Sequence, residues 1–215
     1  MSKIKTINQL QNYLDNDLSW RIKEIASLKL LVRTSSLVNK NTAVRAGIPL
    51  LYGHWEGFVK NASTNYLEFI NGQMLTYSEL KSCFVVFGLK KKINELVLSK
   101  KSEISIASLD FIRSEMDKKA RLKIESAIRT EFNLSSKVFA NIACSIGIDT
   151  SRYEGKFNLI DKRLLNRRNS IAHGEYMDLD PDGFRNLADE IISLLRSFKT
   201  DIENAVSLED YKTSA

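Results

Sequence analysis

Apolar residues recur every three to four positions over most of this chain, and this helical spacing is the feature that most restricts its fold. It predicts a long first helix over residues 7–34, because the apolar side chains then gather on one face. These side chains are Ile7, Leu10, Tyr13, Leu14, Leu18, Ile22, Ile25, Leu28 and Val32. Two prolines and nine glycines in 215 residues leave few obligatory helix breaks. The expected fold is therefore an all-α bundle of long antiparallel helices.

A second helix is expected from about Thr42 to Asn71, where Asn71-Gly72 provides an end signal. Its wide apolar face comprises Ile48, Leu51, Tyr52, Trp55, Phe58, Val59, Ala62, Tyr66 and Ile70. Pro49 leaves two alternatives open. Either the helix begins near Ile48 with the proline in its first turn, or it is kinked at the proline.

The middle of the chain gives a weaker signal. A third helix is expected over Ser78–Ser99, although residues 83–88 also resemble a short buried strand; no partner strand is evident nearby, so the helix is preferred. Residues 105–111 allow an extended linker, and the mixed charge of residues 110–129 indicates an exposed helix or a mobile insertion. Such an insertion would cover about residues 100–130.

The last third of the chain has clear helix boundaries. Residues 133–136 cap a helix that stops at Gly147, and a further helix is expected over about 158–173. Residues 178–183 form a turn before a last amphipathic helix with Phe184, Leu187, Ile191, Leu194, Leu195, Phe198 and Ile202. The tail from about 207 to 215 is expected to fray. No linker between domains is evident, so residues 1–215 are interpreted as a single domain.

Charge and composition restrict the function classes. The formal charge of +6 is compatible with a polyanionic partner, but lysine clusters at residues 90–92, 100–101 and 118–119 are interpreted as solvated helix faces. No apolar run is long enough to span a bilayer, and the first residues lack a secretory core, so a cytoplasmic protein without a membrane partner is expected. Cys83 and Cys144 lack metal-ligand spacing and are expected to be small buried hydrophobes. No metal and no cofactor is predicted.

One arginine breaks the apolar pattern near the end of the 158–173 helix. Arg168 is spaced i+4 from Leu164 and i−3 from Ile171, so a guanidinium occupies a position in the apolar stripe. A buried cation needs a carboxylate, a phosphate or a shared cavity, because burying it unpaired is very costly. A basic pair, Lys162-Arg163, and the neighbouring Arg167 lie close by. This pattern indicates a site.

His173 and Asn169 are the other polar candidates on this helix. Asn169 lies i−4 from His173, so its amide can orient the imidazole or bind a ligand oxygen. Arg168 lies about 140° from His173 on an ideal helix, so the two converge only if the helix ends or distorts there, or if two chains meet across a two-fold axis. The alternative is a C-terminal helix cap, with Gly174 as the left-handed stop.

A second candidate stretch lies on the Thr42–Asn71 helix. It contains His54, Glu56 and Lys60. Glu56 is i−4 from Lys60, which favours an ordinary surface pair, but the same carboxylate can instead pair with Arg168. Gly53 and Gly57 are four residues apart and are compatible with a close helix crossing.

These residues carry a family resemblance. Residues 168–173, Arg-Asn-Ser-Ile-Ala-His, resemble the R-x4-6-H signature of the HEPN superfamily (higher eukaryotes and prokaryotes nucleotide-binding). The stretch 52–60, followed by Tyr66, resembles the matching helix of a microbial branch of stand-alone HEPN ribonucleases. With the turn at residues 146–149, the resemblance extends over roughly residues 10–200.

The resemblance implies a helical bundle that forms a homodimer, in which two such motifs make a composite active site. Many members are metal-independent endoribonucleases of toxin, antiphage or RNA-processing systems, so an RNA substrate and a toxin or antiphage-defence role are expected, with an antitoxin or regulatory protein as a further partner. The alternative is a catalytically silent HEPN module that binds RNA, a nucleotide or a partner protein. A third alternative is a helical interaction protein in which Arg168 and His173 only cap and dimerise.

The resemblance also implies roles for individual residues. His173 would be the general acid or base, Arg168 would stabilise the charge of the phosphorane, and Asn169 would position the phosphate or the histidine. Supporting or substrate-binding roles would fall to Glu56, His54, Arg167 and Lys60. A related group carries a modifiable tyrosine two residues after the histidine. Here Tyr176 lies three residues on, so modification of Tyr176 is not expected by analogy.

Overall fold

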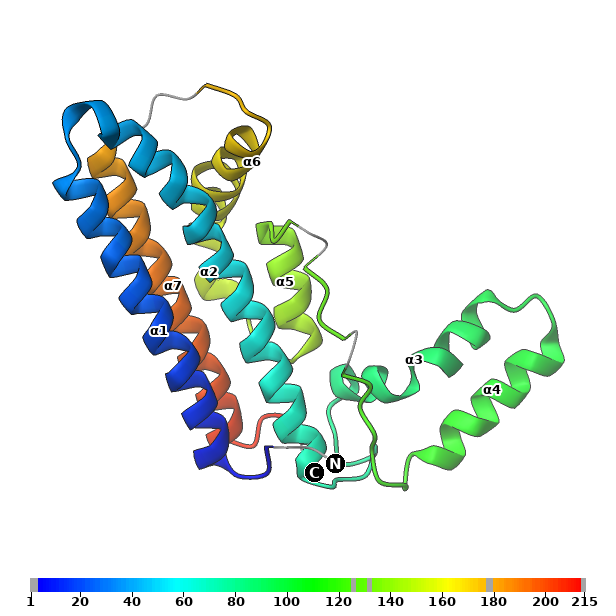
Figure 1. The fold of residues 1–215 in the computed structure, drawn as a ribbon. Helices are drawn as coiled ribbons and strands as arrows, with labels where there is room; N and C mark the ends of the chain where they lie inside the picture. The colour runs from blue at the N-terminus through cyan, green and yellow to red at the C-terminus, as the bar shows by residue number, and fades with distance from the viewer. Residues whose placement is uncertain (1–3, 125–126, 131–132, 177–179, 214–215) are drawn as a thin grey trace.

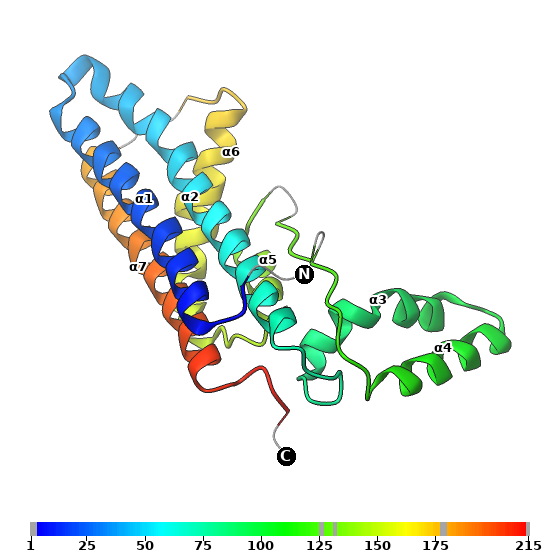
Figure 2. The same ribbon diagram turned by 60° about the horizontal axis from the view of Figure 1, so that its bottom comes forward.

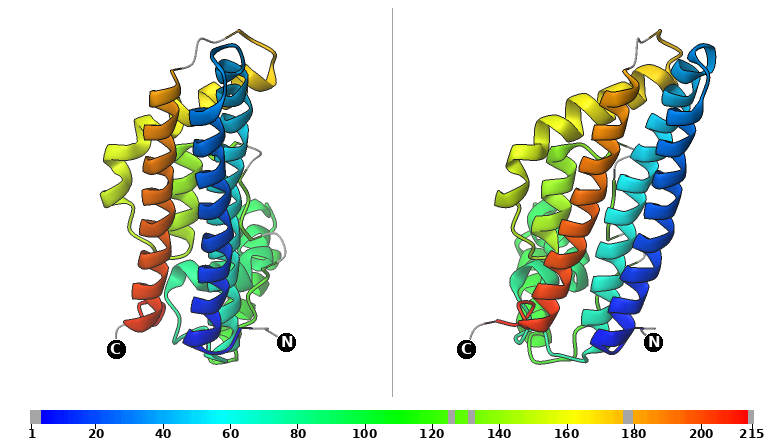
Figure 3. Two further views of the ribbon diagram at one scale, coloured as in Figure 1. Left: turned by 60° about the vertical axis from the view of Figure 1, so that its left-hand side comes forward. Right: turned by 90° about the vertical axis from the view of Figure 1, so that its left-hand side faces the viewer.

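The computed structural model describes residues 4–124, 127–130, 133–176 and 180–213. These residues fold into helices, and they contain no β-strand. Three long helices pack against one another as the body of the molecule: α1 (Ile7–Thr34), α2 (Leu37–Gly72) and α7 (Pro181–Ser207). Figure 1 and Figure 3 show them side by side along the length of the bundle. The predicted all-α bundle is confirmed.

Helix α1 has the bounds predicted from its apolar spacing. It begins after Thr6, whose side chain accepts a hydrogen bond from the Gln9 backbone N–H while the Gln9 side chain accepts one from the Thr6 backbone N–H. Two members of the predicted stripe differ, because Ile7 and Tyr13 remain 41% and 47% exposed. The predicted core face of this helix is therefore too wide.

Helix α2 runs without a break through Pro49 and begins earlier than predicted. The alternative start near Ile48 is therefore wrong. An interior proline removes one backbone hydrogen bond and costs about 3 kcal/mol or more. Val44, Ile48 and Leu51 on either side of it are almost fully buried, and this packing offsets the cost.

Helices α3 (Ser82–Leu98) and α4 (Ser102–Glu115) form a helical hairpin that projects from one end of the bundle (Figures 1 and 2). The predicted third helix is confirmed, and the strand alternative for residues 83–88 is wrong. The extended linker predicted for residues 105–111 is also wrong, because these residues belong to α4. Residues 116–118 form a turn, Lys119 forms an isolated bridge with Thr76, and residues 120–124 have no regular structure. The predicted insertion also includes residues 125–126, which lie outside the described ranges.

Short helical elements fill the chain between the hairpin and α7, and the first of them ends at the predicted glycine. Helix α5 (Ser136–Ser145) begins at Ser135, whose side chain accepts a hydrogen bond from the Val138 N–H, and it ends before Gly147 with φ +71°. A 3-10 helix, η1 (Ser151–Lys156), leads to a helical segment in two parts: a π-helix, η2 (Leu159–Asn166), and α6 (Arg167–Ala172). Both parts pack against α2.

The C-terminal helix α7 is capped by Asp180, whose side chain accepts hydrogen bonds from the N–H groups of Asp182 and Gly183. Residues 178–179 of the predicted turn lie outside the described residues. After α7, Tyr211 is buried against Phe69, and the Thr213 N–H donates to the Glu79 carbonyl. The described part of the expected frayed tail is thus attached to the bundle; residues 214–215 lie outside it.

Three predicted features concern single residues and surfaces. Cys144 is exposed rather than buried, and burial of the half-buried Cys83 raises the pKa of its thiol. Most of the lysines at 90–92, 100–101 and 118–119 are exposed, as a solvated face requires. No described helix has the length and apolar character that a membrane crossing needs.

Candidate active site

The helix that carries the motif ends in a regular backbone cap. Gly174 adopts φ +76°, its N–H donates to the Ile171 carbonyl at 3.1 Å, and the Glu175 N–H donates to the Ser170 carbonyl at 2.9 Å. These two bonds define a Schellman motif, in which glycine tolerates the left-handed backbone. The predicted cap is therefore present, but it uses backbone groups. It does not require the side chain of Arg168 or that of His173, so it does not explain their presence.

A π-helix directly precedes the motif. Residues 159–166 are wound more widely than an α-helix, and Leu164 and Leu165 both become buried. The Asp161 carboxylate accepts hydrogen bonds from the Ser136 N–H at 2.7 Å and the Ser136 hydroxyl at 2.6 Å, which attaches this segment to the start of α5. Such π segments frequently lie at functional sites. The sequence carries no spacing signal that would have identified this one.

Arg168 is half-buried, and its described contacts come from α2, from α6 itself and from the segment before α5. Its Nη1 donates to the Asn169 side-chain oxygen at 2.8 Å and to the Asn133 side-chain oxygen at 3.1 Å. Its guanidinium carbon lies 4.5 Å from the centre of the Tyr52 ring. An aromatic face and two amide oxygens thus set the plane of the guanidinium.

The sequence predicts an ion pair between Glu56 and Arg168, and the structure gives a different contact for each. Tyr52 connects the two. Burial raises the pKa of the Tyr52 hydroxyl to about 12. The Leu134 N–H, which donates to that hydroxyl at 2.7 Å, and the charge of Arg168 oppose this rise, while Glu56 adds to it. Tyr52 therefore remains a neutral phenol.

Tyr52 and Asn133 are candidate functional residues that the sequence analysis missed. The spacing places Tyr52 on the apolar face and the resemblance includes it in the 52–60 stretch, but neither predicts a contact with Arg168; Tyr52 is i−4 from Glu56 and so shares its side of α2. The sequence indicates Asn133 only as part of the cap of the helix that stops at Gly147. That Asn133 reaches Arg168, 35 residues further along, depends on the fold and has no sequence signal.

The other residues of the motif take distinct positions. Because the Asn169 side-chain oxygen accepts from Arg168, its present role is to orient the guanidinium. His173 is exposed at the end of α6, and its backbone N–H donates to the Asn169 carbonyl. Arg167 is half-buried, and Tyr176 is 84% exposed.

Arg45 is a further cation at this end of the bundle. It lies in α2, and its Nη1 donates to the Glu175 carbonyl at 2.8 Å. This bond holds the chain that follows His173 against the N-terminal half of α2. No sequence pattern indicates Arg45, because only the fold brings it to the chain after His173.

His54 lies on a different face of α2 from Glu56. The two residues are two positions apart, about 200° around a helix. The His54 imidazole is buried against α1, with Nε2 3.1 Å from the Glu24 carboxylate and the ring 5.4 Å from that of Trp20. Burial lowers the pKa of His54, with Arg21 adding to that effect and Glu24 opposing it. The structure does not bring His54 together with Arg168.

Lys60 and the two glycines of α2 also lie apart from the motif. Lys60 is exposed, and no ion pair with Glu56 is found among the contacts of the described residues. A Cβ added at Gly57 would lie 2.9 Å from the Arg21 guanidinium of α1, whereas one at Gly53 would meet nothing within 4 Å. The predicted close crossing therefore exists at Gly57, and it is a crossing with α1.

The fold and the site together define an all-α bundle that presents an arginine, an asparagine and a histidine at a capped helix end. The chain matches the model of the RiboL-PSP-HEPN family over residues 16–204, and it belongs to this family. Membership supports a nucleotide-binding or ribonuclease-like module. No curated protein and no solved structure was found to match the chain. Among the described residues, no three His, Cys, Asp or Glu side chains are grouped closely enough to hold a metal ion.

Proposed function

We propose that this protein is a metal-independent endoribonuclease of HEPN type, acting as a toxin or antiphage-defence effector. The observation that carries the proposal is the position of Arg168. Tyr52, Asn133 and Asn169 orient its guanidinium within one helical turn and a half of the exposed His173. An oriented cation and an accessible imidazole at one helix end are the two groups that phosphoryl transfer needs.

The chemistry uses the substrate's own nucleophile. The ribose 2′-OH attacks the adjacent phosphorus, the bond to the 5′-oxygen breaks, and the products are a 2′,3′-cyclic phosphate and a 5′-hydroxyl. His173 would take the proton from the 2′-OH or give one to the leaving 5′-oxygen, since imidazoles exchange protons near neutral pH. Arg168 would stabilise the charge that develops on the phosphorane oxygens. This mechanism cleaves RNA and not DNA.

The geometry favours a site completed by a second chain. Arg168 and His173 lie about 140° apart on a helix, and the regular cap at Gly174 does not turn one toward the other. In a two-fold dimer, the arginine of one protomer can face the histidine of its partner. A homodimer with two composite sites is therefore part of the proposal, and an antitoxin or regulatory protein would act by covering the exposed His173 end.

The proposal is tested with Arg168→Ala and His173→Ala on a panel of RNAs, with and without EDTA. Each variant is expected to lose at least about 100-fold in cleavage rate, and EDTA should leave the wild-type rate unchanged. Tyr176→Phe is the matched control, because it alters an exposed side chain three residues after His173. A wild-type protein that binds RNA without cleaving it would instead support the silent HEPN module.

A further inference from the structure

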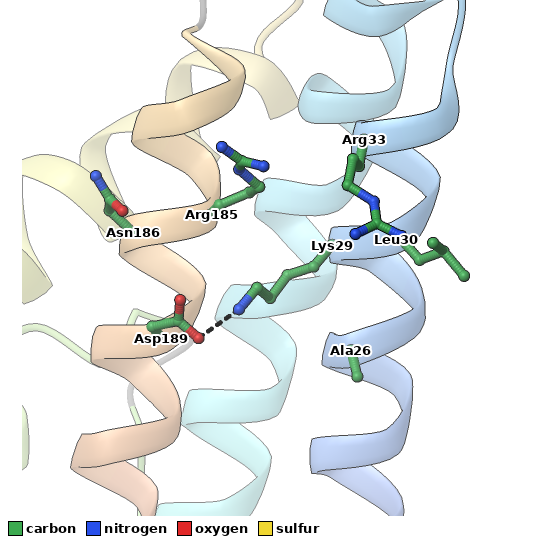
Figure 4. A pocket seen from close by; sticks show the side chains of 7 residues that line it. All are labelled: Ala26, Lys29, Leu30, Arg33, Arg185, Asn186 and Asp189. Atoms are coloured by element: carbon green, nitrogen blue, oxygen red, sulfur yellow. Dashed lines mark hydrogen bonds and ion pairs between the residues drawn. The ribbon is translucent and has the colours of Figure 1, made fainter.

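A second cationic pocket lies on the outer face of the bundle, between α1 and α7. It has a volume of about 520 Å³. Figure 4 shows its lining, which comprises Ala26, Lys29, Leu30, Arg33, Arg185, Asn186 and Asp189. None of these residues belongs to the site around Arg168. Arg33 and Arg185 are 152 positions apart in the sequence, so only the fold places them in one pocket.

The pocket gathers more positive charge than its own carboxylates balance. Lys29 forms an ion pair with Asp189 across the pocket, and Arg185 pairs with Asp182 in the first turn of α7. Arg33 has no ion-pair partner among the described residues. It also lies i+4 from Lys29, a spacing at which like charges repel. The C-terminal end of α1 favours a cation at Arg33. It does not explain the facing cation at Arg185.

The lining indicates which part of a ligand the pocket would contact. The pocket contains no aromatic side chain on which a base could stack, and its apolar members are limited to Ala26 and Leu30. The charged side chains come from two neighbouring helices, Lys29 and Arg33 from α1 and Arg185 and Asp189 from α7 (Figure 4). Arginine and lysine side chains on an open surface recognise phosphate oxygens without reading sequence.

The C-terminal end of α1 and the N-terminal end of α7, which line the pocket, lie at the same end of the bundle as α6, after which His173 follows (Figures 1 and 3). Residues 174–180 connect Gly174 to α7, and an extended chain of that length bridges roughly 25 Å at most. Arg185 lies in the second turn of α7, only a few ångströms further along the helix. An RNA strand at the motif is therefore within reach of the pocket.

We infer that the Lys29–Arg33–Arg185 pocket binds backbone phosphates of the RNA strand that is cleaved at the motif. This inference rests on the proposed function for the identity of its ligand. The pocket contacts the RNA strand at a distance from the scissile phosphate, so it contributes to affinity and not to the chemical step. Losing it should therefore raise KM and leave the rate at saturating RNA unchanged.

The test uses the full chain with His173→Ala, so that a labelled RNA oligonucleotide is bound without being cleaved. Arg33→Ala/Arg185→Ala in this background should weaken RNA binding by about five- to tenfold and reduce the slope of log affinity against log salt by about one to two. The matched control is Lys23→Ala/Arg196→Ala. It removes the same charge from exposed positions of the same two helices, outside the pocket.

Two results would overturn the inference. One is a double variant whose affinity and salt slope fall no further than those of the control. The other is calorimetric binding of ATP or pyrophosphate that depends on Arg33 and Arg185 while RNA affinity does not, which would assign the pocket to a free phosphate ligand. The two proposals can fail independently. If the protein with His173 intact cleaves no RNA, the proposed function is contradicted, whereas the binding measurement tests the pocket alone.

Discussion

The Arg168 guanidinium lies 4.5 Å from the centre of the Tyr52 ring, and the Tyr52 hydroxyl accepts a hydrogen bond from the Leu134 N–H. One buried tyrosine thus connects the motif arginine to the segment before α5. Its ring and its hydroxyl have separable roles. The ring orients Arg168, and the hydroxyl satisfies a backbone donor in the core.

Tyr52→Leu should therefore reduce RNA cleavage, because it removes the aromatic face below the guanidinium. Such contacts contribute about 0.5–2 kcal/mol, so a loss of about twofold to thirtyfold in kcat/KM is expected. Tyr52→Phe keeps the ring and should retain most of the activity. Equal loss in both variants would show that the ring contact does not matter.

Tyr52→Phe should instead lower the free energy of unfolding. Removing the hydroxyl leaves the buried Leu134 N–H without its partner, which costs about 1–3 kcal/mol. Urea unfolding of the variant and the wild type measures the difference. Tyr13→Phe, at a largely exposed tyrosine of α1, serves as the control and should change stability little.

Stability should fall as the pH is lowered through the range of His54. Burial lowers the pKa of His54 below its usual 6.5, so the unfolded chain binds a proton more readily than the folded one. The contribution of the neutral imidazole is complete above about pH 6.5 and is lost progressively below it, toward the folded pKa. His54→Gln should flatten this dependence in unfolding measured at several pH values, while leaving cleavage intact. If the variant kept the full slope of unfolding free energy against pH, that slope would belong to other titratable groups. The charged groups that face the His54 ring are Glu24, Asp17 and Arg21.

Gly174→Ala should weaken the cap that ends the motif helix. A residue with a side chain at φ +76° is strained by about 1 kcal/mol, and the strain falls on the turn that positions His173. A loss of stability of this size and a reduced cleavage rate are expected. Gly53→Ala in α2 meets nothing within 4 Å and should be neutral or slightly stabilising. If both substitutions had the same effect, the left-handed turn would not be the cause.

The body of the bundle follows from helical spacing, because that spacing is local. The bounds of α1, the cap at Ser135 and the stop at Gly147 could all be predicted from short stretches of sequence. The placement of Arg168, Asn169 and His173 near a helix end could be predicted for the same reason. The sequence could not show that Glu56 and His54 face different helices. Spacing on α2 gives the two sides of the helix but not which neighbour packs against each side.

The remainder of the site depends on long-range packing. Asn133 and Tyr52 reach Arg168 only in the folded chain, and Arg45 reaches Glu175 across 130 positions. The π-helix before the motif and the attachment of Tyr211 to the bundle also have no local signal. The bounds of α4 could not be predicted, because a helix whose only buried residue is Ser108 presents no wide apolar face to a neighbour.

The most direct test of the composite site mixes two inactive chains. Arg168→Ala and His173→Ala proteins are unfolded together, refolded as an equal mixture and assayed for RNA cleavage. If Arg168 of one protomer acts with His173 of its partner, half of the dimers carry one intact site, and about a quarter of the wild-type activity should return. A mixture that forms dimers and is as inactive as either parent would contradict the composite site.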